Sequence, residues 1–305
     1  MKNMRQSKKQ QYTVFEFIDR FPDDDSAKQY LYERKWKDGY FCRKCKSTTG
    51  YSVVSDGFTR QCNKCDYRES VTSGTLFHKI KFPLWKAFWI VYQMAQRKKG
   101  ESSMELSRSL GLRQKTCWLF RRKAQEAMKS SGKYPLQNQI EVDEFMIGGI
   151  DDQAVGRMPG KKRLVVMGIE RVGENQIGRA YAKVISSADH IELGKFMDEH
   201  ISKDAQIRTD KWRGYLPLKD KYNIEQIESA KGENFPQLHT TIMNLKGWLR
   251  GIHHKCSARH LQAYLDEFFF RHNRRNYPDT IFDTLVNRMI NSNPFFIKKL
   301  ELSCA

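Results

Sequence analysis

Residues 140–149, IEVDEFMIGG, carry the first strand pattern of an α/β domain. Ile140 and Val142 alternate with polar neighbours as the inward side chains of a strand do, and Asp143 follows on the same run. Similar patterns continue downstream, strand-like at residues 163–170, 180–185 and 205–209 and helical at residues 189–200. Helical patterns dominate from residue 239 onward. Three strands, a helix, a fourth strand and further helices predict a mixed-sheet order that several nucleic-acid enzymes use.

A helical segment precedes this domain and has the size and rhythm of a helix-turn-helix. In GESSMELSRSLGLRQKTCWLFRRKAQ, a helix over Met104–Leu110 is followed by a turn at Gly111 and a second helix. Trp118 and Leu119 would dock that second helix from behind. We expect it to present basic side chains to DNA, namely Arg113, Lys115, Arg121 and Arg122. The alternative is a small helical bundle that joins two domains.

Two CxxC pairs mark a metal site farther upstream. Cys42 and Cys45 form the first pair, Cys62 and Cys65 form the second, and 16 residues separate the pairs. A two-residue gap lets both thiolates of a pair reach one ion, so the two pairs predict a closed tetrahedral site for a structural Zn²⁺. Disulfides or a redox pair are the alternatives. Basic residues around the pairs suit contact with phosphates or a solvated surface: Lys44, Lys46, Arg60, Lys64 and Arg68.

The composition points to a polyanionic partner. Lys and Arg number 54 against 35 Asp and Glu, a net charge of +19, which favours nucleic acid over an anionic membrane surface. The opening residues MKNMRQSKKQQ have no apolar signal-peptide core, and the longest apolar stretch, residues 82–95, is too short to span a bilayer. We therefore expect no membrane partner and a reducing compartment, the cytoplasm or nucleoid of a bacterium. There, closely paired cysteines bind metal more often than they form disulfides.

Acidic residues near strand ends are the candidates for chemistry. Asp143 lies in the first strand-like run, and Asp210 ends a later one in AQIRTDKWRGY. Carboxylates at strand ends can converge at one edge of a sheet and hold Mg²⁺ or Mn²⁺, as metal-assisted phosphodiester displacement requires. The alternative is that these acids are merely solvated. Other carboxylates are also available: Glu144, Asp151, Asp152, Asp204, Asp266 and Glu267.

Four blocks of the sequence resemble the signatures of the zinc-ribbon DDE transposases of bacterial insertion sequences. They are SGTLFHKIKFPLWKAF, VDEFMIGG, TDKWRGY and HTTIMNLKGWLRGIHHKCSARHLQAYLDEFFFRHNRR. The resemblance runs from about Cys42 to Asn287. It implies an RNase H-like catalytic domain behind a zinc ribbon and a DNA-binding helical segment. The implied domains are residues 1–80 for the N-terminal helices and ribbon, 81–135 for the helical segment, and 136–305 for the catalytic core and C-terminal helices.

The resemblance also selects the catalytic residues. Asp143 and Asp210 match the first two acids of the triad, and Asn244 stands at the third position, where many members have Glu. An amide can offer a carbonyl oxygen to Mg²⁺ but brings no negative charge. The metal would then need help from Asp266, Glu267 or the scissile phosphate.

Basic residues near the third position are expected to grip DNA phosphates. Lys246 and Arg250 lie four residues apart, on one helical face. The run RHNRR, with Arg271, Arg274 and Arg275, is too basic to be buried cheaply and predicts a DNA-facing surface.

These features together predict an enzyme that cuts and joins DNA with a divalent metal. Water would attack the element's ends and expose a 3′-hydroxyl, which would then attack target DNA. The ribbon and helical segment would recognise terminal inverted repeats, and the resemblance implies a homodimer or larger assembly. Two alternatives stay open: a DNA-binding regulator with a decayed catalytic domain, and a metal-dependent nuclease that cuts without joining.

Overall fold

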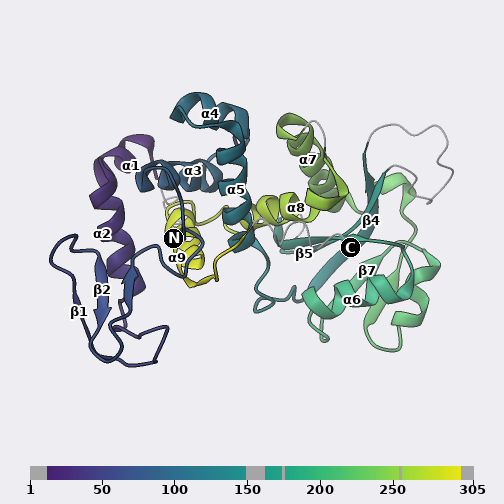
Figure 1. Ribbon diagram of the computed structural model, residues 1–305. Coiled ribbons are helices and arrows are strands. Elements are labelled where there is room, and N and C mark those ends of the chain that lie inside the picture. The colour runs from purple at the N-terminus through teal and green to yellow at the C-terminus, as the bar shows by residue number, and fades with distance from the viewer. Residues whose placement is uncertain (1–11, 149–161, 174–175, 254–255, 297–305) are drawn as a thin grey trace, which may run out of the picture. The chain divides into compact units, whose positions relative to one another are not determined.

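The computed structural model describes residues 12–148, 162–173, 176–253 and 256–296. The chain forms two compact units (Figure 1). The first unit contains the described residues of Met1–Met128 and Asn276–Ala305, and the second is Lys129–Arg275. Each unit has its own core, and each is described separately.

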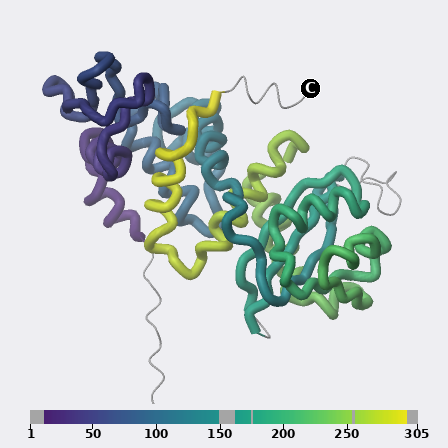
Figure 2. The backbone as a smooth tube through the Cα atoms, turned by 90° about the horizontal axis from the view of Figure 1, so that it is seen from below, coloured from purple at the N-terminus to yellow at the C-terminus, as the bar shows by residue number. Residues whose placement is uncertain are grey.

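The first unit is mainly helical. Its helices are α1 (Val14–Arg20), α2 (Asp24–Lys35), α3 (Leu84–Gln96), α4 (Ser103–Leu110), α5 (Gln114–Met128) and α9 (Ile281–Asn291). Capping boxes at Thr13 and Asp23 start α1 and α2 by satisfying backbone amides of the first turn. The apolar helix α3 is buried on most sides because α2, α5 and α9 all pack on it. Figure 2 shows α9 running beside these N-terminal helices.

A three-stranded antiparallel sheet completes this unit. Its strands are β1 (Gly50–Ser52), β2 (Thr59–Cys62) and β3 (Arg68–Ser70), in the order β1-β2-β3. Glu69 of β3 is 1% exposed, and its Oε1 lies 2.9 Å from both Lys35 Nζ and Arg43 Nε. Burial lowers the pKa of Lys35 to about 8, although Glu69 opposes the change. This buried ion pair ties the small sheet to α2.

The second unit is built on a mixed five-stranded sheet, as the sequence predicts. Its strands are β4 (Gln139–Ile147), β5 (Arg163–Arg171), β6 (Ile177–Ile185), β7 (Gln206–Thr209) and β8 (Asn223–Gln226). The order is β6-β5-β4-β7-β8. The pairs β4–β5 and β5–β6 are antiparallel, whereas β4–β7 and β7–β8 are parallel. β8 is short and polar, and the hydrophobic pattern did not predict it.

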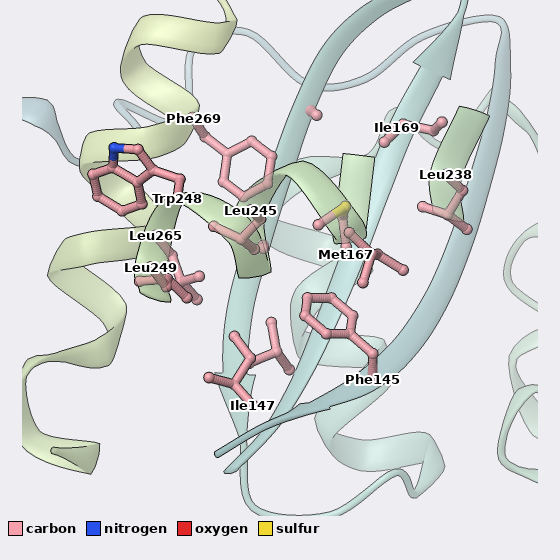
Figure 3. Close-up of a cluster of buried hydrophobic side chains, with 14 of the residues drawn as sticks. Phe145, Ile147, Met167, Ile169, Leu238, Leu245, Trp248, Leu249, Leu265 and Phe269 are labelled. Carbon is pink, nitrogen blue, oxygen red and sulfur yellow. The ribbon is translucent and has the colours of Figure 1, made fainter. Parts of the chain in front are cut away.

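Helices cover both faces of this sheet. One face packs on α6 (His190–His200) and the 3₁₀ helix η1 (Arg213–Leu218). The other packs on α7 (Pro236–Ile252) and α8 (Ala258–His272), and a 3₁₀ turn, η2 (Ala230–Gly232), precedes α7. Figure 3 shows Phe145, Ile147 and Met167 of the sheet meeting Leu245 and Leu249 of α7. The period of two along β4 produces this division, since successive side chains point to opposite faces.

The packing groups the chain differently from the three predicted domains. Residues 276–296 pack with the first unit rather than with the second, because α9 buries apolar side chains against α3 and α5. The ribbon and the helical segment likewise fall in one unit. Within the described residues, every helix is too short or too polar to cross a bilayer.

Candidate functional site

The four paired cysteines converge in the first unit. Cys42 and Cys45 precede β1, Cys62 ends β2, and Cys65 lies in the turn before β3. Their sulfur atoms all lie within 4.8 Å of one another, with Cys42–Cys65 at 3.6 Å and Cys45–Cys62 at 3.5 Å. Sulfur ligands of a tetrahedral Zn²⁺ lie about 3.8 Å apart, given Zn–S bonds of about 2.3 Å. The four thiols therefore fit one zinc ion.

The two CxxC turns have matching backbone geometry. The amide of Lys46 donates to the carbonyl of Cys42 and that of Asp66 to the carbonyl of Cys62, and both donors have positive φ. Burial opposes ionisation of Cys42, but the amides of Cys45 and Lys44 donate to its sulfur and lower the pKa of the thiol to about 6. A thiolate is the form that binds zinc.

Asp143 and Asp210 meet at one end of the mixed sheet. Val142 of β4 pairs with Thr209 of β7 in parallel register, so the residues that follow them, Asp143 and Asp210, come next to each other. The backbone amide of Trp212 donates to Asp210 Oδ1 at 3.0 Å and orients that carboxylate. The expected convergence of these two acids is present in the structure.

Glu144 brings a third carboxylate to the same place. Oxygen atoms of Asp143, Glu144 and Asp210 lie within 4.8 Å of one another. The hydroxyl of the fully buried Tyr215 donates to Glu144 Oε2 at 2.7 Å, and the amide of Glu144 donates to Asp143 Oδ1 at 2.8 Å. Neighbours in a strand normally point to opposite faces. The pairing of β4 with β7 covers Gln139 to Val142 and ends there. The side chains of Asp143 and Glu144 converge just beyond that end.

Asn244 lies on α7 with an exposed side chain. His239, five residues earlier on the same helix, brings its Nε2 to 3.8 Å from Asp143 Oδ2. Five residues correspond to about 140° around a helix, so Asn244 projects from a different side of α7 than His239 does. The family resemblance selected Asn244 as the third triad residue and did not select His239, which the structure brings close to Asp143.

Lys246 and Arg250 follow His239 on the same side of α7. Lys246 Nζ lies 5.2 Å from the centre of the Phe145 ring, two residues along β4 from Asp143. Burial is the main cause that lowers the pKa of Lys246, and the nearby charge of Arg250 adds to it, while Asp143 opposes it. The acids therefore have a positively charged flank. Arg250 is exposed.

Glu141 is a buried acid on the same strand as Asp143 with a different environment. It is fully buried, and its Oε1 lies 3.3 Å from Arg171 Nη1 and 3.6 Å from Arg208 Nη1. Burial raises its pKa, while the two arginines and His239 oppose the rise. Glu141 thus braces β4 between its neighbours β5 and β7.

The predicted helix-turn-helix elements are present, but two of its basic residues are buried. Gly111 ends α4 in the left-handed conformation with φ 63°, which a residue with a side chain adopts less readily. Arg113 and Lys115 are exposed at the start of α5. Arg121 and Arg122 are 3% and 7% exposed, and Arg122 donates to Gln125 at 2.7 Å. The prediction that Arg121 and Arg122 are exposed to DNA is wrong, because their guanidinium groups lie on the buried side of α5.

The RHNRR run makes several contacts within the second unit. Arg271 lies over the Trp248 ring at 5.0 Å, Arg274 donates to the carbonyl of Phe270 at 3.0 Å, and Arg275 donates to the carbonyl of Gly178 at 3.1 Å. Asn273 both donates to and accepts from the backbone of Ala180, at 2.9 Å each. Asn273 and Arg275 therefore hold the end of α8 against the edge strand β6, while Arg275 is exposed and Arg271 and Arg274 are half-buried, so DNA contact by this run stays a prediction.

The carboxylates of α8 do not join the cluster around Asp143 among the described residues. Glu267 is fully buried, and Asp266 accepts a hydrogen bond from Gln262 at 3.0 Å. Among the described residues, the third carboxylate beside Asp143 and Asp210 is Glu144, whereas the sequence suggested Asp266 or Glu267 for that role. Asp151 and Asp152 lie outside the described residues.

Comparison with known proteins finds family matches over both the cysteine cluster and the acidic cluster. Residues 135–273 match the ISXO2-like transposase domain, and residues 22–68 match the transposase zinc-ribbon domain. A protein of Halobacterium salinarum, described as an uncharacterized protein in transposable element ISH50, is 22% identical over 282 residues. That similarity covers 83% of this chain and 92% of the Halobacterium protein. The first match contains Asp143, Glu144 and Asp210, and the second contains all four ribbon cysteines.

Proposed function

The chain belongs to the zinc-ribbon DDE transposases of insertion sequences, with an RNase H-like catalytic domain, and from that premise we propose that it cleaves the ends of a DNA element and joins them to target DNA with a divalent metal. The observation that carries the proposal is the meeting of Asp143 and Asp210 at the ends of two parallel strands inside the transposase-domain match. The buried Glu141, ion-paired within the fold, does not offer such a site.

The donor set at the sheet end fits Mg²⁺ or Mn²⁺. Both ions take oxygen ligands, and the converging groups are carboxylates. We assign Asp143 and Asp210 as ligands and Glu144 as the third negative charge, held in place by Tyr215. Asn244, at the family's third position, stays in the proposal as an uncharged oxygen ligand. When bound, the metal would activate the attacking oxygen and stabilise the leaving one.

The reaction proceeds as two in-line displacements at phosphorus. In the first, water attacks a phosphodiester at the element's end, the P–O3′ bond breaks, and a free 3′-hydroxyl remains. In the second, that hydroxyl attacks a phosphodiester of the target, so one P–O bond forms as another breaks. His239 and Lys246 flank Asp143 on the α7 side and would contact the DNA phosphates there.

The zinc ribbon and α5 are assigned to DNA recognition. Around the knuckles, Lys44, Lys46, Lys64 and Arg68 are exposed, and Arg113 and Lys115 are exposed at the start of α5. Exposed cations of this kind neutralise phosphates and release counterions, which makes binding depend on salt. We assign the terminal inverted repeats to these surfaces, and we propose that a homodimer acting on nucleoid DNA holds the two ends.

Labelled element ends, incubated with the zinc-loaded protein and Mg²⁺, test this function. The substrate is taken from the DNA that flanks this gene. Cleaved strands followed by joined products are expected, and the rates of both should fall by roughly 10²–10³-fold with Asp210→Asn. The matched control is Asp204→Asn, an exposed acid just before the opposite end of β7. Binding without cleavage would contradict the proposal and favour a regulator, and cleavage without joined product would favour a nuclease.

Two further variants examine the third ligand. Asn244→Ala should lower strand transfer if its oxygen binds metal, and wild-type transfer would remove Asn244 from the site. Glu144→Gln keeps the size of the side chain and can keep the Tyr215 contact, but removes the negative charge. It should lower transfer more than Asn244→Ala does, since charge attracts the metal more strongly than a neutral oxygen.

A further inference from the structure

A hollow of about 590 Å³ opens in the second unit, and one of its lining residues, Trp212, follows Asp210 by two positions. Three segments line it: Leu164 of β5, the loop from Ser186 into the start of α6, and the turn from Trp212 into η1. Leu164 pairs with Met146, near the carboxyl end of β4. The hollow therefore lies toward the same end of the sheet as Asp143 and Asp210, on the face covered by α6.

Hydrogen bonds join the wall of the hollow to the acidic site. Trp212, which lines the hollow, donates its amide to Asp210 Oδ1 at 3.0 Å. Gln226 Nε2 donates to the carbonyls of both Asp210 and Trp212, at 3.1 and 2.9 Å. A DNA strand whose phosphate sits at Asp210 would thus lie directly beside the hollow.

The walls are fixed by the fold itself. The indole Nε1 of Trp212 donates to the carbonyl of Ala188 at 2.7 Å and joins the two sides. Gly214 permits this contact, because a Cβ there would lie 2.4 Å from the Ala188 oxygen and 2.7 Å from Trp212 Nε1. On the other side, Asp189 accepts from the amides of Ile191 and Glu192 and caps α6.

The lining suits a flat ring with a polar edge. Leu164, Ala188, Trp212 and Pro217 supply apolar surface, and Ser186, Ser187 and His190 supply hydrogen-bonding groups. The exposed Arg213 holds its guanidinium 5.6 Å from the Trp212 ring and could meet a phosphate at the rim. The volume lies within the range of small-molecule sites, and every nucleobase combines a stacking face with a polar edge.

We propose that this hollow receives one unstacked nucleobase of the DNA strand whose phosphodiester lies at Asp143 and Asp210. The inference rests on the proposed function, because the acids bring the strand there. Removing one base from the stack costs free energy, and the binding site must recover that cost. A seated base would fix the position of the neighbouring phosphate, so the hollow would act in positioning the strand.

Photo-cross-linking tests the proposal without requiring catalysis. The probe is a 20-nucleotide oligothymidylate in which every third base is 5-iodouracil, mixed with zinc-loaded protein and Mg²⁺ replaced by Ca²⁺. After irradiation, mass spectrometry identifies the cross-linked residues. Trp212 should be among them. Ser186→Trp fills the hollow from an exposed position and should reduce the Trp212 cross-link at least tenfold. Ser131→Trp, an exposed serine outside the lining, is the matched control and should leave it unchanged.

Two results would overturn the nucleobase site. One is a wild-type protein that binds the oligonucleotide but cross-links only elsewhere, and the other is a Trp212 cross-link that Ser186→Trp leaves at full strength. The labelled-end assay separates this failure from that of the proposed function. If cleavage and joining proceed while Trp212 does not cross-link, the enzyme stands and the hollow has another occupant. If Trp212 cross-links while cleavage is absent, base binding stands and the catalytic proposal fails.

Discussion

The zinc ribbon and the acidic end of the mixed sheet, the proposed site of the divalent metal, are built in opposite ways. The ribbon takes its ligands from two short turns, and each turn is complete within four residues. The acidic site takes its carboxylates from two strands, β4 and β7. These carboxylates meet only because the two strands pair in one register. A closed site of local turns can be predicted from spacing, whereas an open site at a sheet end requires the topology.

The two regions also differ in what their ligands leave open. Four thiolates saturate a tetrahedral zinc, so the ribbon's ion can only hold structure. Three carboxylates would leave positions for water and phosphate on the proposed ion, since such ions prefer six or more oxygen ligands. This difference predicts that loss of zinc affects folding and loss of the sheet's carboxylates affects reaction rate.

Zinc removal should give the largest effect. Structural zinc contributes about 10–16 kcal/mol in zinc-finger peptides, and the ribbon strands have three or four residues each. Chelation or Cys62→Ser should therefore expose the amides of β1, β2 and β3 to hydrogen exchange, while β4 and β5 stay protected. Cys117→Ala, at an isolated cysteine, is the control and should retain zinc. A ribbon that stays protected after complete zinc loss would remove the distinction between the two regions.

Loss of one sheet carboxylate should act on rate alone. Asp143→Asn and Asp210→Asn should each slow cleavage of labelled ends by roughly 10²–10³-fold, the size seen when one preorganised electrostatic group is removed from an active site. Hydrogen exchange of β4 and the zinc content should match the wild type. A variant that cleaves normally, or that loses cleavage only by unfolding the sheet, would disprove the assigned role.

Glu141 should behave as a structural acid although it lies two residues from Asp143. Glu141→Gln leaves Arg171 and Arg208 without their buried counter-charge, which should cost about 3 kcal/mol in the free energy of unfolding. Denaturant unfolding measures this cost. The exposed Glu225→Gln, which weakens a 4.0 Å contact with Arg208, should change stability by less than about 0.5 kcal/mol. Equal effects of the two substitutions would show that Glu141 is not buried as described.

A pH dependence of stability is expected in the second unit, from two buried histidines. Burial lowers the pKa of His200 to about 4, and burial with the nearby Arg275 does the same for His272. Because the folded pKa values lie below the ordinary 6.5, the unfolded chain binds more protons. Stability is therefore complete above pH 6.5 and falls between pH 6.5 and 4, by up to about 3 kcal/mol per histidine.

Hydrogen exchange of β5 at pH 7 and pH 5 checks this dependence. The double variant His200→Gln and His272→Gln should flatten the pH dependence, whereas the exposed His190→Gln should leave it intact. An unchanged slope in the double variant would assign the titration to other groups.

The sequence predicted most of the secondary structure and the whole zinc site. Local information was sufficient there, because the strand and helix patterns and the CxxC spacing lie within short windows. Asp143 and Asp210 could be selected only through family resemblance. Glu144 was not selected because in a regular strand its side chain would point away from that of Asp143. The residue types do not show that the pairing of β4 with β7 ends at Val142.

Basic residues show a second limit of sequence reasoning. Arg113 and Arg121 look alike in the sequence, yet the first is exposed and the second is 3% exposed on the buried side of α5. Arg275 binds the backbone carbonyls of Gly178 and His272. Charge alone indicates a polyanionic partner for the whole protein, whereas the tertiary packing decides which cations can reach it. The place of α9 in the first unit depended on the same kind of long-range contact.

Binding of Mn²⁺ to the zinc-loaded protein, followed by electron paramagnetic resonance, tests the central claim most directly. The account predicts a Mn²⁺ site in the wild type whose affinity falls at least tenfold in both Asp143→Asn and Asp210→Asn, and is unchanged in Asp204→Asn. If both variants bind Mn²⁺ as the wild type does, the register of β4 and β7 does not build a metal site, and the catalytic account is contradicted.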